Sequence, residues 1–104
     1  MKKLLICCIY GVTATSLAKK MQHLADAQGY TLLISAVGLE NFASVAPAFD
    51  AFLVAPHVQY KLDELKRSIR EGQPVMIIEG YPYAAIDAEK ILADAIEQMS
   101  ALSE

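Results

Sequence analysis

The chain has 104 residues, of which 55% are apolar, and its 12 acidic and 9 basic side chains give a formal charge of −3. This length and apolar content predict one domain, residues 1–104, with a sizeable core. The charges are scattered without basic blocks, which excludes an obvious nucleic-acid footprint. The apolar run after Lys2 and Lys3 is interrupted at Tyr10 and Gly11, so it predicts a buried strand of a cytoplasmic protein rather than a signal segment or membrane span.

Apolar runs of strand length alternate with stretches of helical periodicity along the chain. Periodicity for the first helix begins at Leu17, and Gly29 is expected to be its C-cap. Pro47 is expected to end the second helix, and Pro56 to stop the third strand. In chain order the predicted elements are a strand at 3–7, a helix ending at 28, a strand at 31–36, a short helix at 39–46, a strand at 51–55, a surface helix at 58–69, a strand at 75–78 and a last helix from about 84 or 87 to 99.

This alternation predicts an α/β fold with a four-stranded parallel sheet between two helical layers. Right-handed crossovers favour the strand order 2-1-3-4, as in Rossmann-like and low-molecular-weight-phosphatase-like folds. That order has a switch point between the first and third strands, where ligands bind beyond the carboxyl ends of the strands. We expect the loops after Cys8 and Pro56 to meet there, with the loop that carries Tyr83 at the same edge.

Two adjacent cysteines end the first apolar run. Neighbouring side chains of a strand point to opposite faces, so Cys7 and Cys8 are predicted to be free thiols. Cys7 is expected to be a buried packing residue. Cys8 precedes a helix start, where backbone N–H groups and the helix dipole stabilise a thiolate or a phosphate. No C-x-x-C pattern or zinc-ligand spacing is present, and no metal or cofactor is predicted.

The segment after Cys8 suits an anion cradle, because Gly11 permits a tight turn and Thr13 suits a helix start. A Walker-type phosphate loop is excluded, since no Gly-Lys-Ser/Thr follows. A cysteine phosphatase of the C-x5-R pattern would have arginine where Ala14 stands. A low-molecular-weight phosphatase or arsenate reductase is therefore disfavoured.

Three segments carry a resemblance to a known family. Residues 4–21, with Cys8, Gly11, Thr13 and Thr15, resemble the opening of the lactose/cellobiose-type IIB components of the bacterial phosphotransferase system. Residues 53–60, Leu-Val-Ala-Pro-His-Val-Gln-Tyr, are similar to that family's Leu-Gly-Pro-Gln-x-x-Tyr segment, and residues 75–87 resemble its fourth strand and final loop. The resemblance covers essentially the whole chain.

The resemblance implies a phosphocysteine carrier, which is a protein-phosphocysteine–sugar phosphotransferase. Cys8 would accept a phosphoryl group from a phosphohistidine on a IIA protein and pass it to a sugar of the cellobiose, β-glucoside or lactose class, held by the membrane permease IIC. N–H groups of the loop would hold the phosphoryl charge. The loop residues are Ile9, Tyr10, Gly11, Val12, Thr13, Ala14 and Thr15. The narrow apolar stripes of the helices favour a monomer that does not insert into the membrane.

Some residues depart from the family pattern. Tyr10 stands where alanine is common, Val12 replaces methionine, Ala55 replaces glycine and His57 replaces glutamine. These departures leave an alternative open, a regulatory relative that binds the same partners without phosphoryl transfer. A second group of candidate site residues consists of His57, Tyr60 and Tyr83. His57 would either contact the phosphate or the thiolate, or face solvent. Partial burial is expected for the two tyrosines.

Overall fold

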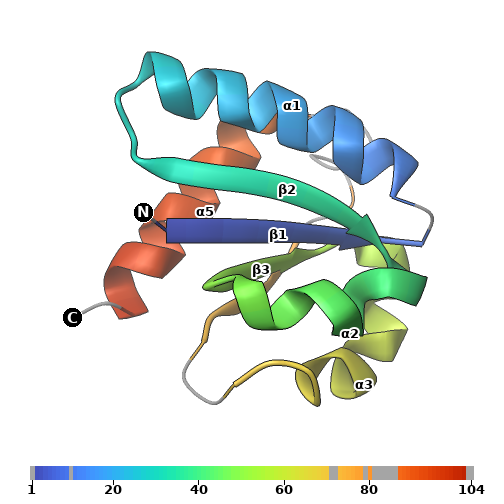
Figure 1. Cartoon of the computed structure of the whole chain (residues 1–104). Coiled ribbons are helices and arrows are strands. Elements are labelled where there is room, and N and C mark those ends of the chain that lie inside the picture. The colour runs from blue at the N-terminus through green and yellow to red at the C-terminus, as the bar shows by residue number, and fades with distance from the viewer. Residues whose placement is uncertain (1, 10, 71–72, 79, 81–86, 103–104) are drawn as a thin grey trace.

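A parallel sheet runs through the middle of the molecule (Figure 1). The computed structural model describes residues 2–9, 11–70, 73–78, 80 and 87–102. Within these residues the strands are β1 (Lys2–Cys8), β2 (Leu32–Gly38), β3 (Ala51–Val54) and β4 (Val75–Ile77). Their order across the sheet is β2-β1-β3-β4, which confirms the predicted order and makes β1 a central strand.

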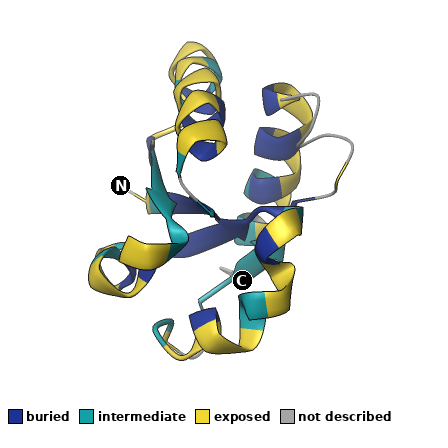
Figure 2. Cartoon of the chain, turned by 90° about the vertical axis from the view of Figure 1, so that its right-hand side faces the viewer, coloured by how far each residue is buried: buried dark blue, intermediate teal, exposed yellow. Residues whose placement is uncertain are grey.

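Helical segments cover both faces of this sheet and turn their buried sides toward it (Figure 2). On one face α1 (Val12–Ala27) packs beside α5 (Ala88–Leu102). The other face is covered by α2 (Phe42–Val45), α3 (Leu62–Lys66) and three 3-10 helices, namely η1 (Leu39–Asn41), η2 (Ala46–Ala48) and η3 (Pro56–Lys61). Across the described part of the chain, no helix combines the length and apolar character that crossing a membrane requires.

The hydrophobic core is built around the central strand. The side chains of residues 4–7 are at most 1% exposed, and Cys8 is 3% exposed. A strand between two helical layers is buried on both faces, which explains the uninterrupted apolar run in its sequence. Phe42 of α2 and Phe52 of β3 extend the core on one side, with ring centroids 5.6 Å apart and planes tilted by 59°.

The first helix begins at Val12, five residues before the Leu17 that periodicity predicted. The prediction missed this turn because Ala14 is its buried member and alanine gives little hydrophobic signal. The other end lies at Ala27, one residue before the predicted end, and Gly29 directly follows the C-cap residue Gln28. Gly29 has φ of 81°, its N–H donates to the Asp26 carbonyl (3.2 Å), and the N–H of residue 30 donates to the carbonyl of residue 25 (2.9 Å). This pair of bonds is a Schellman motif, which glycine favours because of the positive φ.

Two predicted helices are divided in the structure. The one expected at 39–46 continues to Ala48 as 3-10, α and 3-10 segments, and Pro47 lies in the first turn of η2 instead of ending the helix. A first helical turn tolerates proline because its N–H would lack a partner there anyway. The surface helix expected at 58–69 is η3 followed by α3, and after Lys66 the chain continues in tighter turns with bonds to carbonyls three residues back.

The last helix, α5, starts at Ala88, and the Asp87 carboxylate accepts the Lys90 N–H at 3.2 Å as an N-terminal cap. This matches the later of the two predicted starts, and the helix continues to Leu102 rather than ending at 99. The earlier start, residue 84, lies outside the described residues.

An unpredicted side chain joins α1 to the edge strand β2. Gln22 donates to the Leu32 carbonyl and accepts from the Ile34 N–H, both at 2.8 Å. Edge strands leave backbone groups without a neighbouring strand, and burying such groups unpaired is costly. Gln22 therefore satisfies two polar groups of β2 where α1 covers the sheet.

Candidate functional site

The carboxyl ends of β1 and β3 bring two loops together at the predicted switch point. Cys8 is the last residue of β1, and Pro56 begins η3 just after β3. The N–H of Ala55 donates to the Cys7 carbonyl at 2.9 Å, so the two chain segments stay paired where they leave the sheet. Parallel strands open a crevice at such a point, and side chains from both loops can reach it.

The Cys8 thiol is held by the backbone that follows it. Its sulfur, Sγ, lies 2.9 Å from the Gly11 nitrogen, whose N–H donates to it. Gly11 has φ of 81°, and a Cβ on this residue would lie 3.1 Å from the Gly38 nitrogen. Both the left-handed backbone and the close approach to β2 therefore require glycine. The turn that aims an N–H at the sulfur depends on this one residue.

The positive end of α1 lies directly beyond that turn. The first three N–H groups of the helix, on Val12, Thr13 and Ala14, have no acceptor within α1. Thr15 is different, because its N–H (2.9 Å) and its hydroxyl (2.6 Å) both donate to the Gly11 carbonyl. The N–H of Thr15 is thus committed to the helix, and this residue stabilises the turn. The three preceding N–H groups give the site its positive character.

Two further contacts hold the residue after the cysteine. The Ile9 carbonyl accepts the Leu39 N–H at 3.1 Å, which ties the loop to the end of β2. The Ile9 N–H donates to Nε2 of His57 at 3.4 Å. The structure therefore brings His57 to the Cys8 loop, although its sequence position is about fifty residues away. Its Nε2 accepts a hydrogen bond from the loop backbone in this arrangement.

Two other sequence-predicted residues, Tyr60 and Val12, have exposed side chains. Tyr60 is 71% exposed on η3, so the expectation of partial burial is wrong for this side chain. Val12 is also largely exposed, at 76%. Tyr10 and Tyr83 lie outside the described residues. Leu39, which fixes the loop through Ile9, was missed because its contribution comes from the backbone, and a side-chain pattern does not reveal it.

The two cysteines differ in their surroundings. Both are free thiols. Cys7 is fully buried, and burial together with the neighbouring Cys8 raises its pKa from 9.0 to about 12. Such a thiol stays protonated near neutral pH and is a poor nucleophile. Cys8 instead accepts a hydrogen bond from the N–H of Gly11. Cys7 is therefore a packing residue, whereas Cys8 lies at the turn that can stabilise an anion.

The chemistry available at this turn is that of a sulfur nucleophile beside backbone donors. Ala14 occupies the place where a C-x5-R phosphatase has arginine, and its side chain is fully buried in the core. A phosphoryl group on Cys8 would therefore be held by N–H groups rather than by a guanidinium clamp. Such a site can stabilise a covalent thiophosphate without the charge that promotes its rapid hydrolysis.

Three comparisons identify related proteins. The family model described as "PTS system, Lactose/Cellobiose specific IIB subunit" matches residues 3–94. The oligo-beta-mannoside-specific EIIB component of Bacillus subtilis (strain 168) is 28% identical over 100 residues, which cover 95% of this chain and 97% of that protein.

Two solved structures share the fold. The cellobiose-specific phosphotransferase IIB component from Borrelia burgdorferi has a TM-score of 0.76 at 24% identity, over 96% of this chain and 93% of that one. The lactose-specific IIB component domain from Streptococcus pneumoniae has a TM-score of 0.81 at 20% identity, over 93% of this chain and 96% of that one. With a family model spanning most of its length, this chain belongs to the lactose/cellobiose-specific IIB subunits of the phosphotransferase system, which act in phosphoryl transfer during sugar uptake.

Proposed function

We propose that Cys8 is the residue that carries the phosphoryl group. Its thiolate would attack the phosphorus of a phosphohistidine on the IIA partner, forming an S–P bond as the N–P bond breaks and the imidazole leaves. The sugar hydroxyl held by IIC would then attack the same phosphorus, and the Cys8 thiolate would leave. The single observation that supports this most is the 2.9 Å contact between Cys8 Sγ and the Gly11 N–H.

The phosphoryl oxygens would be held by N–H groups of the surrounding turn. Gly11, Val12, Thr13 and Ala14 contribute donors at the positive end of α1. The Ile9 N–H is occupied by His57, so we propose that His57 positions this part of the loop and yields the N–H when a phosphoryl oxygen arrives.

Transfer is favoured over the two alternatives. A regulatory relative that only binds partners would have no need of a thiol beside helix donors, and Cys8 is present with its donor in place. A hydrolase would need a group to bind the transferring phosphoryl bidentately, and buried Ala14 cannot do so. Slow hydrolysis suits a carrier, since the phosphoryl group must survive until the next partner binds.

The names of the relatives support a sugar class. A cellobiose-specific and an oligo-beta-mannoside-specific component are among them, so we propose β-linked oligosaccharides of the cellobiose or β-glucoside kind as the transported sugars. IIA and IIC would be the protein partners, and the transfer would take place on the cytoplasmic side of the permease. Lactose remains the alternative substrate class, supported by the lactose-specific structure.

Phosphorylation with a matched pair of cysteine variants tests the assignment. The wild type, incubated with phosphoenolpyruvate, the general phosphotransferase proteins and the cognate IIA, should gain about 80 Da for one phosphoryl group on sulfur. Cys8→Ser should gain nothing, because a hydroxyl is a much weaker nucleophile in this turn. Cys7→Ala should be labelled like the wild type. Labelling of Cys8→Ser at the wild-type rate, or loss of label only in Cys7→Ala, would refute the role of Cys8.

A further inference from the structure

The charges of this chain are divided unevenly along its length. Residues 1–25 contain four lysines and no carboxylate, whereas the rest of the chain holds the other five basic and all 12 acidic residues. Lys2 and Lys3 lie at the start of β1, about 20 Å along the strand from Cys8 at a rise of 3.3 Å per residue. The other two lysines, Lys19 and Lys20, lie on α1, the helix that begins at the Cys8 loop.

Lys19, Lys20 and His23 form what we call the basic face of α1. All three are exposed, and together with Leu24 and with Ala88 of α5 they line a shallow hollow of about 490 Å³. The opposite side of α1, which includes Ala18 and Met21, is buried against the core. The hollow lies where α1 meets Ala88 of α5. These two helices pack side by side on this face of the sheet (Figure 2).

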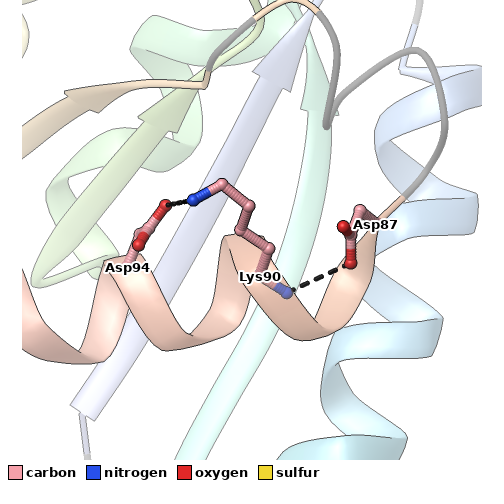
Figure 3. A network of polar contacts seen from close by, with 3 residues as sticks. All are labelled: Asp87, Lys90 and Asp94. Atoms are coloured by element: carbon pink, nitrogen blue, oxygen red, sulfur yellow. Dashed lines mark hydrogen bonds and ion pairs between the residues drawn. The ribbon is translucent and has the colours of Figure 1, made fainter.

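Three carboxylates on α1, at the start of α5 and within α5 have other partners. Asp26 accepts a hydrogen bond from Gln22 at 3.0 Å. At the start of α5, Asp87 accepts the Lys90 N–H, and Asp94 pairs with the Lys90 ammonium group at 3.4 Å (Figure 3). Among the residues that the structure describes, the ion pairs are Lys90–Asp94 and Lys61–Glu64, so Lys19 and Lys20 are in neither. Their positive charge is available to a partner.

Distance decides what this charge can act on. At 1.5 Å per residue, Lys19 lies about 12 Å and His23 about 18 Å along α1 from Gly11. These distances exceed a Debye length of about 8 Å at physiological salt, so the basic face has little effect on the Cys8 thiolate itself. A typical interface covers about 800 Å² per partner, a patch of roughly 16 Å radius. A protein docked over Cys8 whose contact area extends along α1 would therefore reach Lys19 and Lys20.

We propose that the basic face of α1 is a docking surface for an acidic surface of the phosphorylated IIA donor. This inference rests on the proposed function, because it is the donor's phosphoryl group that must reach Cys8. The donor fits better than the permease, since cytoplasmic loops of membrane proteins carry an excess of lysine and arginine and would be repelled. Opposite charges at the rim of an interface mainly speed association and orient the partners.

Charge reversal with a matched control tests the docking surface. The variant is Lys19→Glu/Lys20→Glu, and the control is Lys2→Glu/Arg70→Glu, which changes the net charge equally but lies toward the opposite, amino-terminal edge of the sheet. We measure the Kd for the unphosphorylated cognate IIA and the kcat/KM for transfer from phospho-IIA at low and high salt. Alkylation of Cys8 by iodoacetamide reports whether the thiol is unchanged in every variant.

The Lys19→Glu/Lys20→Glu variant, called the α1 variant, should bind IIA more weakly than the wild type. At low salt its kcat/KM should be lower by about 10-fold or more, because KM rises. This difference from the wild type should be largely lost near 0.5 M salt. The control variant should behave like the wild type, and alkylation rates should be equal. An unchanged Kd, an equal loss in the control, or a loss that salt does not remove overturns the proposal. So does binding of the wild type, but not of the α1 variant, to anionic phospholipid vesicles in place of IIA.

The binding measurement separates this proposal from the proposed function. If Cys8 is never labelled but the α1 variant binds IIA more weakly than the wild type does, the docking surface is supported and the role of Cys8 is refuted. If Cys8 is labelled normally and both variants bind IIA like the wild type, the docking surface fails and the role of Cys8 stands.

Discussion

At the scale of single residues, the geometry around Cys8 depends on Gly11. This glycine donates its N–H to the sulfur and accepts two hydrogen bonds from Thr15 with its carbonyl. It also caps α1 while its backbone has φ of 81°. One residue thus connects the end of the strand, the thiol and the first turn of the helix. A substitution here is expected to affect both stability and chemistry.

Gly29 offers a control for that expectation, because it has the same φ of 81° but nothing lies within 4 Å of a Cβ placed on it. Gly29→Ala should cost about 1–2 kcal/mol of unfolding free energy, the cost of left-handed backbone in alanine. Gly11→Ala should cost about 1–2 kcal/mol more, since its Cβ would also press on the Gly38 nitrogen of β2. Urea unfolding measures both. Equal destabilisation by the two changes would show that the contact with β2 is relaxed at no cost.

Cys7 makes the stability of the protein depend on pH. Burial raises its pKa to about 12, so above the pKa of 9.0 the unfolded chain loses a proton that the folded chain keeps. Unfolding then releases a proton, and the free energy of unfolding should fall by about 1.4 kcal/mol per pH unit from this group between pH 9 and 12. Below pH 9 the group contributes no slope.

Comparison of the wild type with Cys7→Ala isolates this effect from other groups that titrate at high pH. Denaturant unfolding at pH 8, 9.5 and 10.5 should give a steeper decline for the wild type than for the variant. The variant should be less stable at pH 8, because it leaves a small cavity beside β1. Parallel declines for the two proteins would mean that the Cys7 thiol ionises in the folded state.

At the scale of elements, α1 combines several roles in one helix. Its buried side covers the sheet, its first turn supplies N–H groups to the candidate site, and its outer side carries Lys19 and Lys20. Its position over β2 is maintained by Gln22, which bonds the backbone of that edge strand on either side of Leu33. The placement of the helix start relative to Cys8 therefore depends on a polar contact as well as on apolar packing.

Replacing Gln22 with alanine should lower the free energy of unfolding by about 1–3 kcal/mol, because the Leu32 carbonyl and the Ile34 N–H lose their partner. The matched control is Gln98→Ala on α5, where the glutamine side chain is exposed. That change should stay within about 0.5 kcal/mol. Chemical denaturation of both variants measures the difference. Indistinguishable midpoints would indicate that water replaces Gln22 at the edge of β2.

At the scale of the whole molecule, the large apolar side chains that are exposed among the described residues are dispersed over several elements. They are Val12 on α1, Tyr30 after it, Leu33 on β2, Tyr60 on η3 and Ile77 on β4. Scattered apolar residues are normal on a monomer, whereas stable oligomers need a contiguous patch. We therefore expect a monomer of 11.3 kDa in sedimentation velocity at micromolar concentration. A dimer that Ile77→Lys dissociates would instead identify the β4 edge as an interface.

The sequence by itself determined the features that depend on local apolar periodicity and on backbone preferences. The four apolar runs predicted the strands, and their alternation with helices predicted a parallel sheet. The right-handed crossover rule then favoured the order β2-β1-β3-β4, and Gly29 marked the end of α1. The family resemblance also came from local motifs, since the Cys8 loop and the segment around Pro56 are short and continuous.

Only the tertiary structure decided which distant groups meet. The contacts of Ile9 with His57, of Gly11 with Gly38 and of Gln22 with β2 join segments ten to about fifty residues apart. Each depends on how the strands are aligned and where the loops leave the sheet, and hydrophobic periodicity carries no information on either. The early start of α1 was hidden for a related reason, because Ala14 is buried by its position and not by its size. The sequence could therefore identify Cys8, its loop and His57 as candidates, whereas the tertiary structure decided which atoms make contact, such as Nε2 of His57 with the Ile9 N–H.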